Sequence, residues 1–346
     1  MNHERHGEVG RRPGFPVTAS LHLDKEDLLR QGGTDPLGIR RRLLILGGGL
    51  TLILLLLAFG GPVEEVSVSP PHVAEIAPSL SLPLEMNQQV EGWMQRFLTD
   101  QRPVFQKYLE REGLYSDMIR ESLRSRGMPE ELVFLAAIES GFTPGATSRV
   151  SAMGMWQFMS PTAQAYGLRI DGYVDERRDP IRATEAALDY LQTLHDRFGS
   201  WYLAAAAYNA GPSRVAWALS RHEGDAAGEE ELYWEIVDLL PTETRAYVPK
   251  MLAAILLART AEAYGFDVER SKPVRFDRVW VPGGTALAAV AKAVDVPLSR
   301  IRDLNPHLLK GVTPPGEPFG IRVPPGRSPM VVASLGSRWR SVRVDD

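Results

Sequence analysis

The feature that most restricts this chain is an apolar segment, residues 43–59, in which Thr51 is the only polar residue. Its 17 residues reach the lower end of the roughly 17–25 that a helix needs to span a bilayer. Three arginines, residues 40–42, precede it and two glutamates, residues 64–65, follow it. Positive flanks stay on the cytoplasmic side, so we expect everything from residue 62 onward to lie outside the cytoplasmic membrane.

Two other interpretations of this segment stay open. A buried core helix is disfavoured by the glycines at 47–49 and by the abrupt basic border. A cleaved signal peptide is the closer rival, because Ala58-Phe59-Gly60 has the small-x-small form of a cleavage site. The apolar run exceeds a typical signal-peptide core and begins after 42 residues, so we favour an uncleaved single-pass anchor at 43–61.

The remaining chain divides by composition. Residues 1–42 are polar and read as a disordered cytoplasmic tail, and the proline-rich residues 62–84 as an extended linker. Residues 85–265 space their apolar side chains by three and four, which predicts an all-α domain. Residues 272–326 predict a small β-α-α-β module, followed by a tail at 327–346.

The same spacing predicts individual elements. In the helical domain we expect helices over residues 85–98, 102–112, 115–126, 130–139, 161–166, 181–198, 201–209, 213–219, 233–239 and 243–264. In the module we expect strands at 274–281 and 319–323 and helices at 283–293 and 297–305.

Charge and cysteine content exclude several classes of protein. Lys and Arg number 39 against 43 Asp and Glu, and without a basic stripe we expect no nucleic-acid partner. The absence of Cys excludes thiol catalysis, Cys-ligated zinc and disulfides. The seven His residues lack ligand-like spacing, so we expect no metal and no cofactor. No protein partner is indicated.

Glu139 is the most informative candidate for chemistry. It ends a predicted helix whose residues 132–138 are all apolar, and Gly141 is well placed to stop that helix in a left-handed conformation. Burial and the negative end of the helix both disfavour ionisation, so we expect its pKa to be raised. Such an acid can protonate a glycosidic oxygen. A structural Glu paired with an Arg is the alternative.

Two further segments offer groups that suit a sugar. Residues 151–159 read Ser-Ala-Met-Gly-Met-Trp-Gln-Phe-Met, and residues 207–212 read Ala-Tyr-Asn-Ala-Gly-Pro. Each alone fits ordinary turns and core packing. Together they supply an amide, a phenol and apolar walls. The acidic residues after the first segment lie in a turn-rich stretch where we expect solvated side chains without a catalytic role: Asp171, Asp175, Glu176 and Asp179.

Four motifs in order resemble those of the family 1 lytic transglycosylases. They begin at Glu139-Ser140-Gly141-Phe142 and continue with residues 153–159, residues 207–212 and Arg245-Ala246-Tyr247-Val248-Pro249-Lys250. The Trp-Gln-Phe-Met and Tyr-Val-Pro-Lys forms resemble the membrane-bound lytic murein transglycosylase D branch. The resemblance covers about 180 residues, from 85 to 265.

This resemblance implies a lysozyme-like helical fold with a groove for peptidoglycan strands. It implies cleavage of the β-1,4 bond between N-acetylmuramic acid and N-acetylglucosamine without water. One Glu, here Glu139, acts as acid and then as base on the muramic acid O6. The other residues that match the family's site are Ser148, Gln157, Met159, Tyr208, Asn209 and Tyr247, the first five against the sugar and the last beside the acid.

The module at 272–326 resembles a degenerate LysM domain, through Gly284-Thr285-Ala286-Leu287, Leu304-Asn305-Pro306 and Ile321-Arg322-Val323-Pro324. Its altered opening leaves both glycan binding and a purely structural role open. For the whole chain, a hydrolysing muramidase and a catalytically silent glycan-binding scaffold remain the alternatives to a transglycosylase anchored in the cytoplasmic membrane.

Overall fold

A computed structural model describes residues 82–222 and 230–335. The predicted cytoplasmic tail, the anchor at 43–61 and nearly all of the linker lie outside these residues. Within the described part, no helix is both long enough and apolar enough to cross a membrane.

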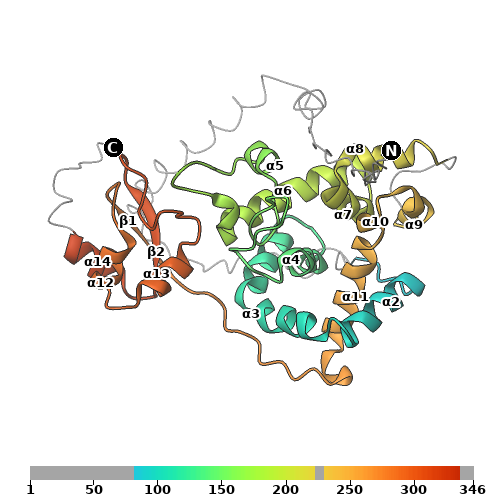
Figure 1. Cartoon of the computed structure of the whole chain (residues 1–346), viewed down its shortest axis with the longest axis horizontal. Helices are drawn as coiled ribbons and strands as arrows, with labels where there is room; N and C mark the ends of the chain where they lie inside the picture. The colour runs from blue at the N-terminus through green and yellow to red at the C-terminus, as the bar shows by residue number, and fades with distance from the viewer. Residues whose placement is uncertain (1–81, 223–229, 336–346) are drawn as a thin grey trace, which may run out of the picture. The chain divides into compact units, whose positions relative to one another are not determined.

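The prediction of a helical domain followed by a small two-stranded module is confirmed (Figure 1). In chain order the domain holds α2 (Gln88–Leu98), α3 (Arg102–Ser125), α4 (Val133–Ser140), α5 (Ser160–Ala165), α6 (Pro180–Phe198), α7 (Trp201–Ala210), α8 (Pro212–Leu219), α9 (Leu232–Ile236), α10 (Thr242–Arg245) and α11 (Tyr247–Arg259). Short 3-10 turns lie at Glu130–Leu132, Glu176–Arg178, Val237–Leu239 and Ala261–Tyr264.

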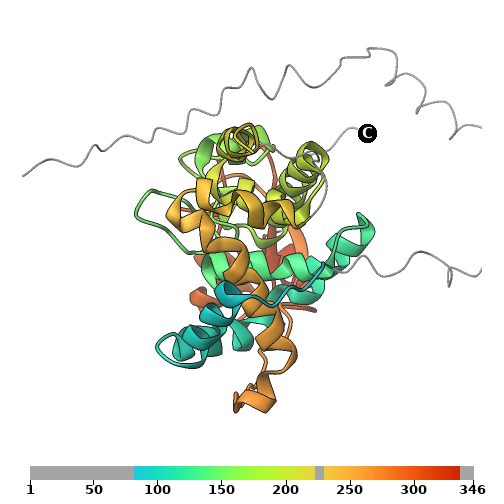
Figure 2. The same ribbon diagram turned by 90° about the vertical axis from the view of Figure 1, so that its right-hand side faces the viewer.

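The buried centre of the domain is built on α4, α7 and α11. All residues from Val133 to Ile138 of α4 are buried, as are Tyr202–Ala207 of α7. The alanines of α7 let α6 and α11 pack closely against it. Helix α11 also packs on α2, although the two are far apart in sequence (Figure 1 and Figure 2). The first site motif therefore lies on a helix that is covered on every side.

In two places the structure divides the helical domain differently from the prediction, and the helix predicted over 283–293 begins only at Leu287. Residues 102–112 and 115–126 form one helix, α3, that runs through Gly113. The backbone of Ser271 packs there so closely that an added Cβ would lie 2.0 Å from its carbonyl oxygen. Gly113 therefore serves a close approach of chain and does not end the helix.

The helix predicted over 243–264 is instead α10, α11 and the turn at 261–264, with a break at Ala246. Pro249 has no N–H to donate to the Arg245 carbonyl. The buried Tyr233 hydroxyl donates to that carbonyl at 3.1 Å and to the Thr244 carbonyl at 3.2 Å. These bonds satisfy the carbonyl groups at the break.

The C-terminal module, residues 277–335, has its own core. Strands β1 (Asp277–Val281) and β2 (Phe319–Val323) pair antiparallel, with Val279 opposite Ile321. Helices α12 (Leu287–Ala293) and α13 (Leu298–Leu304) lie between them in sequence. A third helix, α14 (Ser328–Leu335), packs on β1 and buries Val331, within the segment predicted as a tail.

Candidate active site

Glu139 lies in the last turn of α4, as the sequence predicts. Gly141 ends the helix in the left-handed region at φ 59°, and its N–H donates to the Ala137 carbonyl at 2.7 Å. A side chain here would also meet the Tyr108 ring, 2.9 Å from an added Cβ. Sequence and packing therefore both require glycine two residues after Glu139.

The carboxyl group of Glu139 accepts a hydrogen bond from Tyr247. The Tyr247 hydroxyl lies 2.6 Å from Glu139 Oε1, across the contact between α11 and α4. Burial raises the pKa of Tyr247 well above its usual value, and the neighbouring carboxylate raises it further. The phenol therefore stays protonated and can only donate to the acid.

The pKa of Glu139 is raised to about 7 from an ordinary value of 4.5, chiefly because protein surrounds the carboxyl group. The residue keeps a partly exposed surface, so the acid is enclosed but accessible. The Tyr247 hydrogen bond and the charge of Lys250 both lower the pKa, and Glu243 raises it. An acid whose pKa lies near neutral pH can both donate and accept a proton.

Lys250 holds the end of the same helix. Its Nζ donates to the Ile138 carbonyl at 3.1 Å, one residue before Glu139. A cation at the C-terminus of a helix is favourable, because free carbonyl groups carry partial negative charge there. Burial lowers the pKa of Lys250, whereas the charges of Glu139 and Glu243 oppose this shift.

The second motif forms a loop, residues 146–159, here called the motif loop. Short bridges pair Met153 with Thr147 and with Phe158. Ser140 at the end of α4 donates its hydroxyl to the Met155 carbonyl at 2.8 Å. The Tyr208 hydroxyl donates to the Trp156 carbonyl at 2.8 Å. The loop is thus attached to α4, at the residue next to the acid, and to α7.

The predicted sugar-contacting residues fall into two groups. Tyr208 lies close enough to Glu139 that the carboxylate charge, after burial, raises its pKa. Ser148, Gln157 and Met159 lie on the motif loop, where Met159 is 37% exposed. Gln157 has φ 49° and donates to the Gly154 carbonyl at 2.7 Å. The described hydrogen bonds do not join these three side chains to Glu139.

Asn209 takes part in a network with two residues of α10. Its Oδ1 accepts from the Thr244 hydroxyl at 2.8 Å, and its Nδ2 donates to Glu243 Oε1 at 3.3 Å. The amide therefore positions an exposed carboxylate that acts electrostatically on Glu139. Sequence reasoning assigned no role to Glu243 or Lys250. Lys250 follows Tyr247 by three residues in α11, which places the two on one side of that helix and could have indicated Lys250. Glu243 lies in α10, before the break at Ala246, so spacing along one helix does not indicate it.

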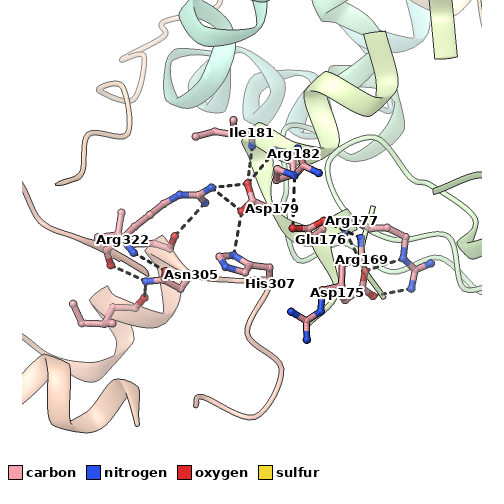
Figure 3. A network of polar contacts seen from close by, with 12 residues as sticks. Arg169, Asp175, Glu176, Arg177, Asp179, Ile181, Arg182, Asn305, His307 and Arg322 are labelled. Atoms are coloured by element: carbon pink, nitrogen blue, oxygen red, sulfur yellow. Dashed lines mark hydrogen bonds and ion pairs between the residues drawn. The ribbon is translucent and has the colours of Figure 1, made fainter. Parts of the chain in front are cut away.

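The prediction that the acidic residues after the second motif are solvated is wrong for two of them. Asp175 and Asp179 are 4% and 3% exposed. Asp175 pairs with Arg177 at 2.7 Å, and Asp179 caps α6 by accepting from Ile181 and Arg182 (Figure 3). Both are structural. Among the described residues, no group of His, Cys, Asp or Glu is arranged to hold a metal ion.

Two known families match parts of this chain. The family described as "Transglycosylase SLT domain" matches residues 117–229. The family described as "Lytic transglycosylase MltD, LysM-like domain" matches residues 275–337.

Curated relatives agree with these families. The chain is 32% identical over 266 residues to the membrane-bound lytic murein transglycosylase D of Escherichia coli strain K12. The aligned residues make up 76% of this chain and 58% of that protein. It is 31% identical over 145 residues to the soluble lytic murein transglycosylase of the same strain, over 40% of this chain and 22% of that protein. The solved structure of the 70 kDa soluble lytic transglycosylase from Escherichia coli aligns over 43% of this chain and 24% of its own, with 27% identity and a TM-score of 0.34.

Proposed function

As a chain that carries an SLT domain and the LysM-like domain of lytic transglycosylase D, this protein belongs to the SLT-domain transglycosylases, and we propose that it cleaves peptidoglycan glycan strands without water. The observation that carries the proposal is a single enclosed carboxyl group with a pKa near 7, held by a tyrosine hydroxyl at 2.6 Å. The fold we propose for the helical domain is lysozyme-like.

In the first step protonated Glu139 gives its proton to the glycosidic oxygen. The bond between that oxygen and C1 of N-acetylmuramic acid breaks, and the N-acetyl group of the substrate stabilises the positive charge at C1. Glu139 is left as a carboxylate. The Tyr247 hydrogen bond and the Lys250 charge stabilise this anion, since both lower the pKa of Glu139.

In the second step the carboxylate removes the proton from the O6 hydroxyl of the same sugar. O6 attacks C1 and closes a 1,6-anhydro ring. Glu139 takes up the O6 proton in place of the one it gave to the leaving oxygen, so no water is consumed and the acid is ready for another cycle. A pKa near 7 suits a group that must serve in both directions at neutral pH.

The remaining predicted residues have supporting roles in this proposal. Gln157, Met159 and Ser148 contact the sugar from the motif loop. Tyr208 holds that loop through the Trp156 carbonyl, and Asn209 holds Glu243. These hydrogen bonds within the protein support a role for Tyr208 and Asn209 in positioning the motif loop and Glu243.

A hydrolysing muramidase is the second candidate, and one observation favours it. Hydrolysis needs a second carboxylate to activate water or to act as nucleophile. Glu243 is a second carboxylate whose charge reaches Glu139. A silent scaffold is less consistent with a carboxyl group kept near neutrality, because glycan binding alone has no use for it.

Product analysis distinguishes these functions. Purified peptidoglycan is incubated with wild type and with Glu139→Gln, and soluble products are identified by mass spectrometry. We expect 1,6-anhydro ends from wild type only. Reducing N-acetylmuramic acid ends would indicate a muramidase. Intact peptidoglycan with both proteins, while both still bind it, would indicate a scaffold.

We also propose that residues 43–61 anchor the protein in the cytoplasmic membrane, with the helical domain on the periplasmic side. Support comes from the apolar run, from its basic N-terminal border and from the relative described as membrane-bound. Membrane fractionation of a tagged full chain tests this. A soluble product that begins after Gly60 would show a cleaved signal peptide instead.

A further inference from the structure

A segment of the helical domain enters the core of the C-terminal module. This docking segment, residues 171–179, follows the second motif. Val174 is fully buried among the apolar side chains of the module. Its backbone bridges Leu308, the Asp175 N–H donates to the His307 carbonyl at 3.0 Å, and the Leu309 N–H donates to the Tyr173 carbonyl at 2.9 Å. The two domains thus share a core residue and a short backbone ladder.

A buried ion pair closes the same contact. Arg322 of β2 places one Nη atom 2.7 and 2.6 Å from the two carboxylate oxygens of Asp179, which is 3% exposed (Figure 3). Asn305 fixes the backbone of Arg322 by accepting from its N–H at 2.8 Å and donating to its carbonyl at 2.7 Å. Although burial opposes ionisation, Arg322 keeps the pKa of Asp179 below its usual value, so the pair is charged at neutral pH.

His307 lies beside this pair without adding a charge at neutral pH. Its Nδ1 is 3.3 Å from Asp179 Oδ2 but makes no hydrogen bond. Burial lowers the pKa of His307 to about 4. The attraction across the contact therefore comes from Arg322.

The docking segment also holds the motif loop. Arg177, buried and paired with Asp175, donates from Nη1 to the Ser151 carbonyl at 3.2 Å and to the Phe158 carbonyl at 3.1 Å. Its own carbonyl approaches Gly154 so closely that an added Cβ would lie 1.8 Å away. Arg177 of the docking segment therefore fixes the motif loop at two points, residues 151 and 158, on either side of Gln157 in sequence.

We propose that the C-terminal module is a positioning element for the glycan site, acting through the docking segment on the motif loop. This inference rests on the proposed function, because it takes the motif loop as the sugar-binding part of the site. The module then determines how well Gln157 and Met159 are placed for substrate, whether or not it binds glycan itself.

The first test is independent of catalysis. Hydrogen exchange of the purified full chain in detergent is followed by mass spectrometry in wild type, Arg322→Met and Trp280→Ala. Trp280 is a matched control in the same module, since it is 51% exposed and its ring lies 5.1 Å from the Arg278 guanidinium. We expect at least about tenfold faster exchange in residues 151–159 of Arg322→Met, and no change in Trp280→Ala. Unchanged exchange at 151–159 while residues 171–179 exchange faster would overturn the proposal.

The second test separates positioning from lost stability. KM and kcat are measured on soluble, peptide-free glycan strands for Arg322→Met, Gln157→Ala and the double variant. We expect Arg322→Met to raise KM about fivefold or more in the wild-type background and by much less when Gln157 is already absent. Equal effects in both backgrounds would overturn the proposal.

Because Arg322→Met leaves a buried carboxylate unpaired, Val174→Ala serves as a milder second variant. Val174→Ala should also speed exchange in residues 151–159 and raise KM mainly when Gln157 is present, with smaller effects than Arg322→Met. Failure to do so would also count against the proposal. A wild type that releases no anhydro product would refute the proposed function alone, since the exchange experiment would still report on the coupling.

Discussion

Replacing Tyr247 with phenylalanine is expected to move the pH dependence of cleavage to higher pH. The hydroxyl donates to Glu139 Oε1 at 2.6 Å and favours the carboxylate over the neutral acid. A hydrogen bond to a charged group contributes roughly 1.5–3 kcal/mol, and one pKa unit corresponds to about 1.36 kcal/mol. Part of the bond persists when the acid is neutral, so we expect the pKa of Glu139 to rise by about one unit.

The assay is kcat/KM for release of 1,6-anhydro ends from about pH 5 to about pH 9. Cleavage begins from protonated Glu139, so kcat/KM falls on the basic side as the acid ionises. The midpoint of this fall should lie near pH 7 in wild type and about one pH unit higher in Tyr247→Phe, whose maximal kcat/KM should be lower. Tyr233→Phe is the matched control, because its buried hydroxyl donates to the Thr244 carbonyl and not to the acid. A basic limb that stays in place or moves to lower pH in Tyr247→Phe would refute the reasoning.

Three further changes test the acid and the helix that carries it. Lys250→Met removes a charge that lowers the pKa of Glu139, so its basic limb should also move to higher pH, whereas Lys250→Arg should resemble wild type. Glu139→Gln should stabilise the fold by about 3 kcal/mol in urea unfolding at pH 8 and by little at pH 4.5. The reason is that the unfolded acid ionises near 4.5 and the folded acid near 7, so wild-type stability falls as pH rises through this window. Leu135→Ala, at a fully buried position of α4, should lower the free energy of unfolding by about 2–5 kcal/mol, against less than about 0.5 kcal/mol for Met86→Ala, where the side chain is 52% exposed.

Local sequence predicts the first motif well because its determinants are close together. An unbroken apolar run predicts a helix without an exposed face, and Gly141 predicts where it stops. Both features follow from neighbours in the chain, and together they place Glu139 in surroundings that raise its pKa. The helical domain and the order of elements in the module follow from the same short-range spacing.

The errors arise where the deciding partner is remote in sequence. Gly113 stays inside α3 because Ser271 packs on it, and the break at Ala246 is supported by Tyr233. Asp179 is buried because Arg322 neutralises it, although 143 residues separate the two. No window of residues around Asp179 contains that cation, so its turn-rich neighbourhood predicts a solvated side chain.

Val174 has a consequence for how such proteins can be recombined. By sequence it belongs to the helical domain, but its side chain completes the core of the C-terminal module. A chimera that joins this helical domain to an unrelated module at residues 266–276 would expose Val174. It would also leave Asp179 without Arg322, the residue with which it forms an ion pair. The unit of exchange is therefore not the contiguous domain. Segment 171–179 and the module must be exchanged together, because each supplies side chains that the other needs.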